Sequence, residues 1–252
     1  MNEEILYGIH PVREALAAGQ RKVSAVYVAA GASGRAVDEV REAAVARGVS
    51  VSRVEADFWK SRKLLRHPVA ARVSPLPERE LHDLLEAARA SGRPGLILVC
   101  DQVEDPQNLG ALARSALCAG AHGLVLARRR AAPLSPAAVK ASAGALEHLP
   151  VARVPNLVRA VETLKEEGYW IFGADAEADA TLWEADFTGP SVLCLGGEGR
   201  GLSRLLAEHC DRVVCIPQSG PVTSLNASAA GSVILFEAAR QRQNEKAKPE
   251  KG

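Results

Sequence analysis

Three segments of the sequence place glycine and polar side chains where a strand is expected to end and a helix to begin. The first, DQVEDPQNLGALAR, carries Asn108 near a predicted helix start and Arg114 inside that helix. The second, LGGEGRGL, carries Glu198 among glycines directly after an apolar run. The third, IPQSGPVTSLNAS, carries Ser224 and Asn226 at the start of the last predicted helix. Open α/β sheets bind ligands at the carboxyl ends of their strands, so these segments are candidates for one site.

The glycine-rich segment does not fit the common dinucleotide-binding pattern. G-x-G-x-x-G requires glycine at its first, third and sixth positions. A register starting at Gly197 meets Leu202 at the sixth position, and one starting at Gly199 meets Arg204. Glu198 would also place a carboxylate where a pyrophosphate lies. A nicotinamide oxidoreductase is therefore disfavoured, and a failure to bind NAD would exclude it.

Each polar residue also has a purely structural interpretation. Asn108 could be a helix N-cap worth about 1 kcal/mol, and Asp105 could serve equally well. Arg114 could form a surface or interface ion pair, although the helix around it is largely apolar. Ser224 and Asn226 could cap the last helix, and the glycine-rich segment could be only a turn. A catalytic interpretation depends on the three segments acting together.

Short apolar strands alternate with helices around these segments. Residues 96–243 contain the strand candidates LILVCD, HGLVLA, YWIFGAD, SVLCLG and RVVCIP. Such alternation predicts a parallel sheet covered by helices on both faces. Residues 1–76 alternate similarly and predict a small α/β domain. Residues 77–95, with prolines at 77 and 94, predict a linker that contains a short helix, and residues 244–252 predict a disordered, charged tail.

Composition excludes several classes of protein. Lys plus Arg is 31 and Asp plus Glu is 30, so net charge does not indicate a partner. The five cysteines form no C-x-x-C pair and the histidines are scattered, so neither a disulfide set nor a metal site is expected. The sequence shows no signal peptide and no apolar run near ~18 residues, which predicts a cytoplasmic protein with no membrane partner.

Basic residues gather in the predicted small domain. The stretch DFWKSRKLLRHPVAAR carries five of them: Lys60, Arg62, Lys63, Arg66 and Arg72. They could form a solvated helix face, or they could face the phosphates of a nucleic acid. The residue types alone favour neither interpretation.

In this order, the three segments resemble motifs 1, 2 and 3 of the SpoU (TrmH) family of RNA ribose 2′-O-methyltransferases. They are similar to D-x-x-x-D-P-x-N-x-G followed by Arg, to G-x-E-x-x-G-L, and to I-P-x-x-G-x-x-x-S-L-N. Their joint occurrence makes a chance match improbable. The beginning, YGIHPVREAL, is similar to the small RNA-binding domain of RlmB-type members. Those members methylate a guanosine ribose in the peptidyl-transferase region of 23S rRNA.

The resemblance implies a fold and a cofactor. The fold is a SPOUT-type parallel-sheet α/β domain with a deep trefoil knot, plus a small N-terminal α/β RNA-binding domain. The cofactor is S-adenosyl-L-methionine, with GGEGRG as one wall of its pocket, and no metal is needed because the methyl donor is already activated. By resemblance, the cofactor-binding residues are Leu195, Gly196, Gly197, Ile216, Pro217 and Leu225.

The resemblance also implies catalytic roles. A family proposal makes Arg114 the general base, but a guanidinium does not readily give up its proton. We therefore favour a bidentate clamp on the target phosphate. Glu198 could accept the hydroxyl proton or orient the nucleotide, or it could only hydrogen-bond to the neighbouring loop. Asn108, Ser224 and Asn226 are assigned to orienting the ribose, the arginine, the glutamate and the knot backbone.

Two macromolecular partners follow from the resemblance. One is a second copy of the chain, because in this family a homodimer formed through the C-terminal domain completes the active site. The other is 23S rRNA, whose phosphates the small domain would contact in a salt-dependent manner through Lys60, Arg62, Lys63 and Arg66.

The sequence departs from the subgroup's pattern at two places. His67-Pro68-Val69 stands where His-Gln-Gly is usual, which weakens the transfer of RNA contacts to this chain. Gln218 stands where methionine is usual, which could alter packing beside the cofactor.

Two alternative functions remain at this level. One is 2′-O-methylation of tRNA or of another rRNA site. The other is a non-catalytic rRNA-binding assembly factor, which should tolerate Arg114→Ala.

Overall fold

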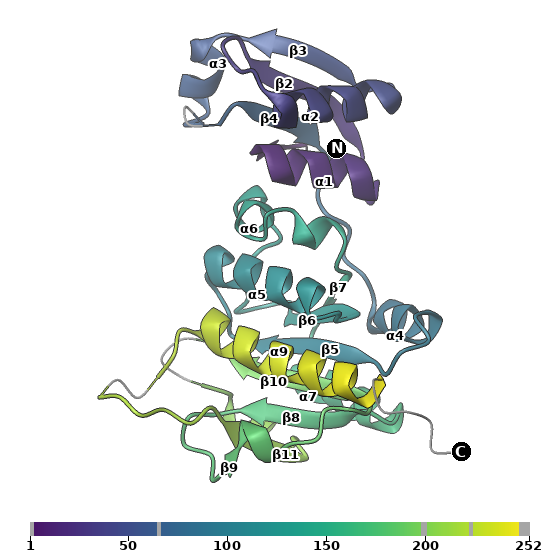
Figure 1. Cartoon of the computed structure of the whole chain (residues 1–252), viewed down its shortest axis with the longest axis vertical. Coiled ribbons are helices and arrows are strands. Elements are labelled where there is room, and N and C mark those ends of the chain that lie inside the picture. Colours follow the sequence, from purple (N-terminus) through teal and green to yellow (C-terminus); the bar gives the residue numbers. More distant parts are fainter. Residues whose placement is uncertain (1–2, 65–66, 198–200, 222–223, 247–252) are drawn as a thin grey trace. The chain divides into compact units, whose positions relative to one another are not determined.

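The chain forms two compact units (Figure 1). The computed structural model describes residues 3–64, 67–197, 201–221 and 224–246. Unit 1 consists of Met1–Pro77 and Pro133–His148, and unit 2 of Glu78–Ala132 and Leu149–Gly252. Sequence analysis assigned residues 133–148 to the predicted 96–243 domain, but in the structure this segment packs with unit 1.

Unit 1 is a four-stranded sheet covered on both faces. The strand order is β1 (Glu4–Tyr7), β4 (Val69–Val73), β2 (Val23–Ala29) and β3 (Ser50–Val54). Only the β2–β3 pair is parallel. Its helices are α1 (Ile9–Ala18), α2 (Arg35–Ala46) and α3 (Ala56–Ser61). Side chains alternate between the faces of a strand, so the fully buried Val26 and Val28 face away from Tyr27, which packs with Trp59 of α3.

A buried ion pair fixes residues 133–148 to unit 1. This segment forms α6 (Pro136–Ala141) and the 3-10 helix η1 (Ala145–Glu147). Arg21 and Glu147 form an ion pair with no side-chain exposure on either residue, and Arg21 Nη1 also donates to Ser74 O at 3.2 Å. Burial raises the pKa of Glu147, and the adjacent guanidinium opposes that rise. Each charge therefore depends on the other for its solvation.

A second contact within unit 1 joins the same segment to α1. Glu14 Oε2 lies 2.9 Å from His148 Nε2, and Arg13 donates to the Glu14 carboxylate. Burial raises the pKa of Glu14, but the hydrogen bonds from His148 and Arg13 outweigh it and hold this pKa below its ordinary 4.5. The backbone of Gly144 passes close by with φ +92°, and a Cβ there would lie 2.6 Å from the Glu14 side chain. Glycine is therefore required at this contact.

Unit 2 contains a seven-stranded parallel sheet, as the sequence predicted. Every strand pair in it is parallel. The strand β5 (Leu96–Asp101) is buried along its whole length because helices cover both faces of the sheet. The order is β7 (Val151–Val154), β6 (Gly123–Ala127), β5 (Leu96–Asp101), β10 (Ser191–Gly196), β8 (Trp170–Ala174), β11 (Arg212–Cys215) and β9 (Ala180–Thr181).

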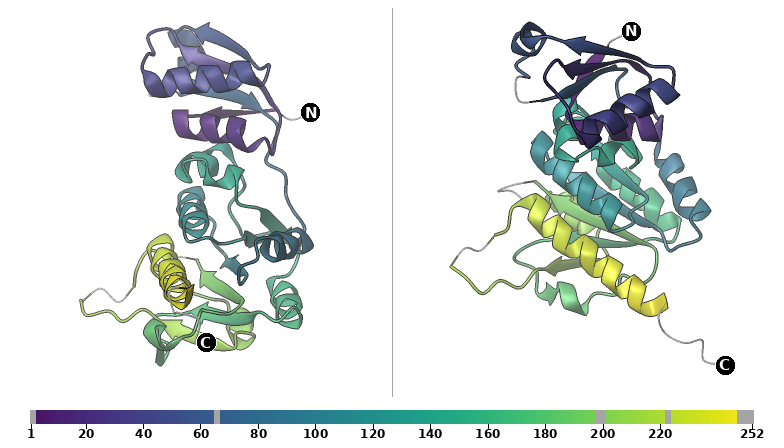
Figure 2. Two further views of the ribbon diagram at one scale, coloured as in Figure 1. Left: turned by 45° about the vertical axis from the view of Figure 1, so that its right-hand side comes forward. Right: turned by 45° about the horizontal axis from the view of Figure 1, so that its top comes forward.

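Two groups of helices cover this sheet. Buried side chains of α4 (Leu81–Ala90), α7 (Leu157–Glu166) and α8 (Arg204–Glu208) form one core layer. On the other face, α5 (Pro106–Cys118) and α9 (Ala227–Lys246) lie side by side (Figure 2). A short 3-10 helix, η2 (Leu182–Glu184), follows β9.

Two local expectations differ from the structure. The helix predicted inside the 77–95 linker is α4, and its Leu84 and Leu85 belong to the core of unit 2. The last helix continues to Lys246, past the predicted end at residue 243, and the rest of the predicted tail lies outside the described residues. Across the described ranges, no helix is long and apolar enough to cross a membrane.

Candidate functional site

The carboxyl ends of β5 and β10 meet in a close backbone contact that only glycine allows. A Cβ on Gly196 would lie 2.0 Å from Gly201 O, and one on Gly197 would lie 2.1 Å from Gln102 O. Gly197 and Gly201 also form an isolated antiparallel bridge. The two ends of the glycine-rich segment are therefore packed against each other, and Gly197 lies against the backbone that follows β5, which explains the glycines at these positions.

Asp101 fixes the far end of the glycine-rich segment. It ends β5, pairs in register with Gly196, and is 6% exposed. Its Oδ2 accepts a hydrogen bond from the backbone N–H of Ser203 at 2.8 Å. A buried carboxylate that accepts from backbone N–H is a strong, orienting contact, so it ties the segment to the sheet.

Asn108 is not the cap of α5. That role belongs to Asp105, whose Oδ1 accepts from Gln107 N at 3.1 Å, with Pro106 at the first helical position. Asn108 is the third residue of the helix and is 8% exposed. Its Oδ1 accepts a hydrogen bond from Asn226 Nδ2 at 3.0 Å. The first and third motifs are thus joined directly through side chains 118 positions apart.

Asn226 performs the structural role that its sequence position suggested. Its Oδ1 accepts from Ser228 N at 2.9 Å and from Ser228 Oγ at 2.6 Å, immediately before α9 begins. The amide oxygen therefore caps the helix while the amide nitrogen donates to Asn108. One side chain both starts α9 and fixes it to α5.

Close packing continues this contact along α5 and α9. A Cβ on Gly231 would lie 2.3 Å from Leu112 Cδ2, and Ser115 Oγ lies 2.7 Å from Ser232 Oγ. Asn108, Leu112 and Ser115 are spaced by one helical turn each and so form one face of α5. This face of α5 packs against α9.

A cavity of about 1000 Å³ opens beside these contacts in unit 2. Most of the predicted cofactor and orienting residues line it, and Pro217 is not among the lining residues. Asp175 and Glu177, which follow β8, line it as well and were not singled out from the sequence. Their position after a buried strand was the available signal. The lining residues relevant here are Leu195, Gly196, Gly197, Ile216, Gln218, Ser224, Leu225 and Asn226.

A smaller cavity of about 360 Å³ adjoins the first and is lined by Asp105, Asn108 and the backbone around Gln102. Gly197 and Ala227 line both cavities. The polar residues of the first motif therefore face a space that continues into the larger cavity.

Arg114 does not line either cavity. It lies on α5 outside the face that contacts α9, and its side chain is exposed. No hydrogen bond or ion pair joins it to another described residue. Glu198 and Arg66, also predicted as site residues, lie outside the described residues. Within a single chain, Asn108, Ser224 and Asn226 therefore line the two adjoining cavities, whereas Arg114 does not.

The predicted RNA-binding residues of unit 1 lie beside aromatic rings. Lys60, Arg62 and Lys63 are exposed. The Arg62 guanidinium lies 4.1 Å from the Phe58 ring centroid, and that ring lies 4.6 Å from the Tyr27 ring. Sequence analysis did not single out these rings, although aromatic residues next to a basic cluster are a known signal of RNA binding.

Comparisons with known proteins identify the family of the chain. The model of the SpoU rRNA Methylase family matches residues 95–236, and the model for RNA 2'-O ribose methyltransferase substrate binding matches residues 5–60. An uncharacterized tRNA/rRNA methyltransferase of Mycobacterium sp. (strain KMS) is 42% identical over 244 residues, which cover 96% of this chain and 77% of the relative.

Two better-described proteins are also similar. The 23S rRNA (guanosine-2'-O-)-methyltransferase RlmB of Escherichia coli (strain K12) is 37% identical over 241 residues, which cover 95% of this chain and 99% of RlmB. The SpoU methyltransferase AviRb from Streptomyces viridochromogenes, solved in complex with the cofactor AdoMet, is 31% identical with a TM-score of 0.80. That match covers 96% of this chain and 91% of AviRb. The predicted family and enzyme class are confirmed: the chain belongs to the SpoU rRNA methylase family.

Proposed function

We propose that the protein transfers the methyl group of S-adenosylmethionine to the ribose 2′-hydroxyl of a guanosine in 23S rRNA, within the peptidyl-transferase region. The observation that carries the methyl-transfer proposal is the hydrogen bond between Asn108 and Asn226, which joins the first and third motifs beside the large cavity. Support for the guanosine substrate comes from RlmB, which aligns with this chain over nearly its full length.

The cavity fits S-adenosylmethionine in size and chemistry. Its volume of about 1000 Å³ suits a nucleoside with an amino-acid tail. Leu195, Ile216 and Leu225 offer apolar surface for an adenine ring, whereas Asp175 and Glu177 favour a cation over an anion. The cofactor supplies a methyl group made electrophilic by the positive charge on sulfur. Pro217 does not line the cavity, and we propose that it holds the backbone of Ile216 in position.

The chain's own residues then position the ribose. Asn108 and Asn226 hold the starts of α5 and α9 at a fixed separation, and Ser224 lines the cavity next to them. Holding a hydroxyl in line with a reacting carbon contributes several kcal/mol by itself. Glu198 is proposed to accept the hydroxyl proton or to orient the nucleotide.

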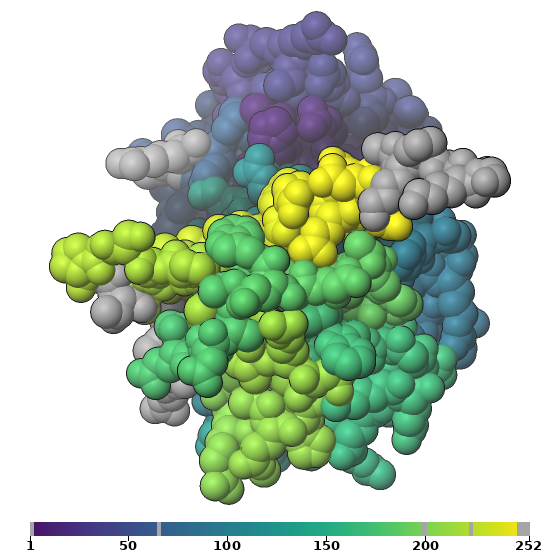
Figure 3. All heavy atoms as spheres, turned by 60° about the horizontal axis from the view of Figure 1, so that its bottom comes forward, coloured from purple at the N-terminus to yellow at the C-terminus, as the bar shows by residue number. Residues whose placement is uncertain are grey.

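The position of Arg114 calls for a second copy of the chain. The side chain is exposed and does not line its own cavity, so we propose that each site in a homodimer takes Arg114 from the other copy to clamp the target phosphate. Part of α9 lies at the surface of unit 2 (Figure 3). There Val233 is 36% exposed and Phe236 51% exposed, and Leu225, before the helix, is 44% exposed. An apolar stripe of this kind suits burial by another copy.

Unit 1 is proposed to bind the rRNA. Lys60, Arg62 and Lys63 would contact phosphates, with Arg66 beside them in sequence, and the Phe58 and Tyr27 rings can stack on unpaired bases. Because the substrate is rRNA, we propose the cytoplasm as the place of the reaction.

We also propose the trefoil knot expected for this family. The packing of α9 against both α5 and β10 supports it.

Methyl transfer from labelled S-adenosylmethionine to unmodified 23S rRNA tests the proposal, with the modified ribose mapped by reverse-transcription stops. We expect one stop at a guanosine of the peptidyl-transferase region. Arg114→Ala should abolish the stop and leave cofactor binding intact. Transfer to tRNA instead of rRNA would contradict the substrate. Cofactor binding without transfer to either RNA would contradict the enzymatic proposal and favour an assembly factor.

A further inference from the structure

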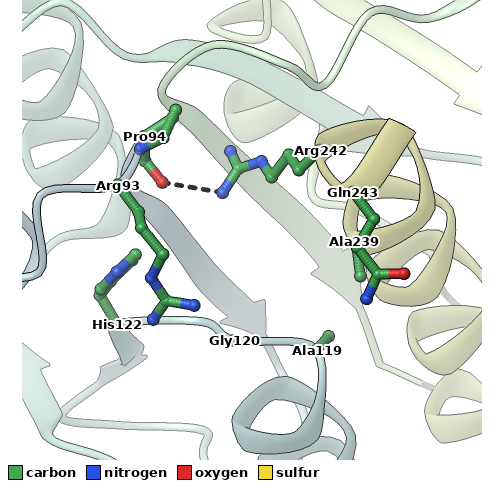
Figure 4. Close-up of a pocket in the computed structure, with 8 residues that line it drawn as sticks. All are labelled: Arg93, Pro94, Ala119, Gly120, His122, Ala239, Arg242 and Gln243. Carbon is green, nitrogen blue, oxygen red and sulfur yellow. Dashed lines mark hydrogen bonds between the residues drawn. The ribbon is translucent and has the colours of Figure 1, made fainter. Parts of the chain in front are cut away.

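A third pocket lies in unit 2, and Figure 4 shows the residues that line it. It has a volume of about 100 Å³, and its lining includes Arg93, His122, Arg242 and Gln243. Arg93 precedes β5 and His122 precedes β6, so the pocket adjoins the amino ends of these strands. The large cavity adjoins the carboxyl ends, and a six-residue strand separates the two by roughly 20 Å. The small pocket is therefore not part of the methyl-transfer site.

His122 presents a buried N–H group without an acceptor. The residue is 7% exposed, and its Nδ1 lies 3.0 Å from the backbone N–H of Leu96. Nδ1 must accept this bond, so the proton of the neutral ring is on Nε2. Burial, with Arg93 and Arg242 nearby, lowers the pKa of His122, which keeps the ring neutral. Nε2 has no hydrogen-bond partner among the described residues. A buried donor left unpaired is unfavourable and rare.

Arg242 is held rigidly at the same pocket. Its guanidinium donates to four carbonyl oxygens, those of Pro94 at 2.9 Å, Gly95 at 3.0 Å, Phe187 at 2.8 Å and Gly189 at 2.7 Å. Only one of these bonds uses Nη1, so one N–H of that nitrogen is not used by the four carbonyls. Burial, with Arg93 nearby, lowers the pKa of Arg242 to about 10, so the group stays charged at neutral pH.

Arg93 adds a second positive charge. Its side chain lies beside His122 in Figure 4, and its residue is exposed. The described residues that line the pocket include no carboxylate. Two guanidinium groups therefore border a space whose described lining carries no negative group, and the unpaired Nε2–H of His122 is buried beside it. This arrangement favours an anion with several acceptor oxygens.

We propose that this pocket binds a phosphoryl oxyanion between the guanidinium groups of Arg93 and Arg242, beside the buried Nε2–H of His122. The volume admits one tetrahedral anion and excludes a nucleoside. The oxyanion belongs either to a free phosphate monoester or to the backbone of a bound RNA. Both present the same oxygens to the pocket, and the experiment separates them.

Calorimetric titration of inorganic phosphate into the full chain, against chloride at equal ionic strength, is the first test. We expect millimolar binding that Arg93→Ala weakens by roughly tenfold. The matched control is Arg159→Ala, because Arg159 is an exposed arginine on α7 that lines neither cavity. This variant should bind phosphate as the unchanged protein does. The proposal is overturned if phosphate does not bind, or if Arg93→Ala binds it as tightly as Arg159→Ala.

Nitrogen NMR of the histidine rings provides a second test that requires no variant of the arginines. His122→Gln identifies the resonances by their loss. We expect Nδ1 unprotonated and Nε2 protonated, with the Nε2 signal moving as phosphate is added. A protonated Nδ1, or an Nε2 signal that does not move at saturating phosphate, would contradict the proposal.

The affinity for an rRNA fragment, measured over a range of salt concentrations, identifies the source of the oxyanion. If an RNA phosphate is the occupant, Arg93→Ala reduces the slope of log K against log salt by about one. If a free monoester is the occupant, the two arginine variants bind RNA alike and only phosphate binding differs. All of these experiments measure binding rather than methylation. Their outcome therefore does not depend on whether the protein transfers a methyl group.

Discussion

The backbone contact at Gly197 allows a quantitative test of the cofactor cavity. An alanine Cβ at this position would lie 2.1 Å from Gln102 O, whereas a relaxed carbon–oxygen contact needs about 3.3 Å. The two backbone segments must therefore separate by roughly 1.2 Å. Overpacking of this kind costs about 1–3 kcal/mol. Because Gly197 lines the cavity, the displacement also moves the cavity wall.

Two measurements on Gly197→Ala test this reasoning. Denaturant unfolding should show a loss of about 1–3 kcal/mol in the free energy of unfolding. Methyl transfer under conditions where the protein remains folded should fall by about a hundredfold, since misplacing reacting groups by about 1 Å has that effect. Gly189→Ala is the matched control, because no atom lies within 4 Å of the Cβ that it would add. Equal stability and equal activity in the two variants would refute the reasoning.

Four further predictions concern other contacts. Glu147→Gln should destabilise unit 1 by about 3–5 kcal/mol in denaturant unfolding, because it removes the buried carboxylate that pairs with Arg21 and leaves only Glu4, whose Oε2 lies 3.8 Å from Arg21 Nη1. Replacing both Arg21 and Glu147 by apolar residues should restore most of the loss. Asn226→Asp keeps the oxygen that caps α9 but removes the amide nitrogen that donates to Asn108, so methyl transfer should be lost. If Asn226 only caps the helix, methyl transfer should be unchanged. Because the pKa of Glu14 is lowered in the folded state, its ionised carboxylate stabilises the fold above pH 4.5, and this contribution is lost as the pH falls through the folded-state pKa. In Glu14→Gln, the free energy of unfolding should therefore change less with pH in that range. Phe236→Glu should convert the proposed dimer to monomers in sedimentation experiments, and an unchanged sedimentation coefficient would argue against that interface.

The sequence predicted the parallel sheet of unit 2 because its strands are short, apolar and separated by helices. The motifs likewise indicated which residues would meet at the carboxyl ends of the strands. Local patterns could not decide between Asp105 and Asn108 as the cap of α5, since both residue types suit that position. In the structure Asp105 accepts the capping hydrogen bond from Gln107 N. The Asn108 side chain contacts Asn226 instead.

Other features depend on contacts that no local pattern encodes. Arg21 and Glu147 are 126 positions apart, so no local pattern could assign residues 133–148 to unit 1. The orientation of Arg114 depends on which face of α5 is covered by α9, and this follows from Gly231 and Leu112 packing together. Neither residue stood out by its chemistry.

The composition of unit 1 has a consequence for synthesis on the ribosome. The chain leaves this unit after Pro77 and completes it only with Pro133–His148. At about 5–20 residues per second, the ribosome needs roughly 4–14 s to add residues 78–148. Throughout that interval Arg21 lacks Glu147, its buried counter-charge. We therefore expect a nascent chain halted before residue 133 to carry a protease-sensitive amino-terminal region, and one extended past residue 148 and clear of the exit tunnel to become resistant.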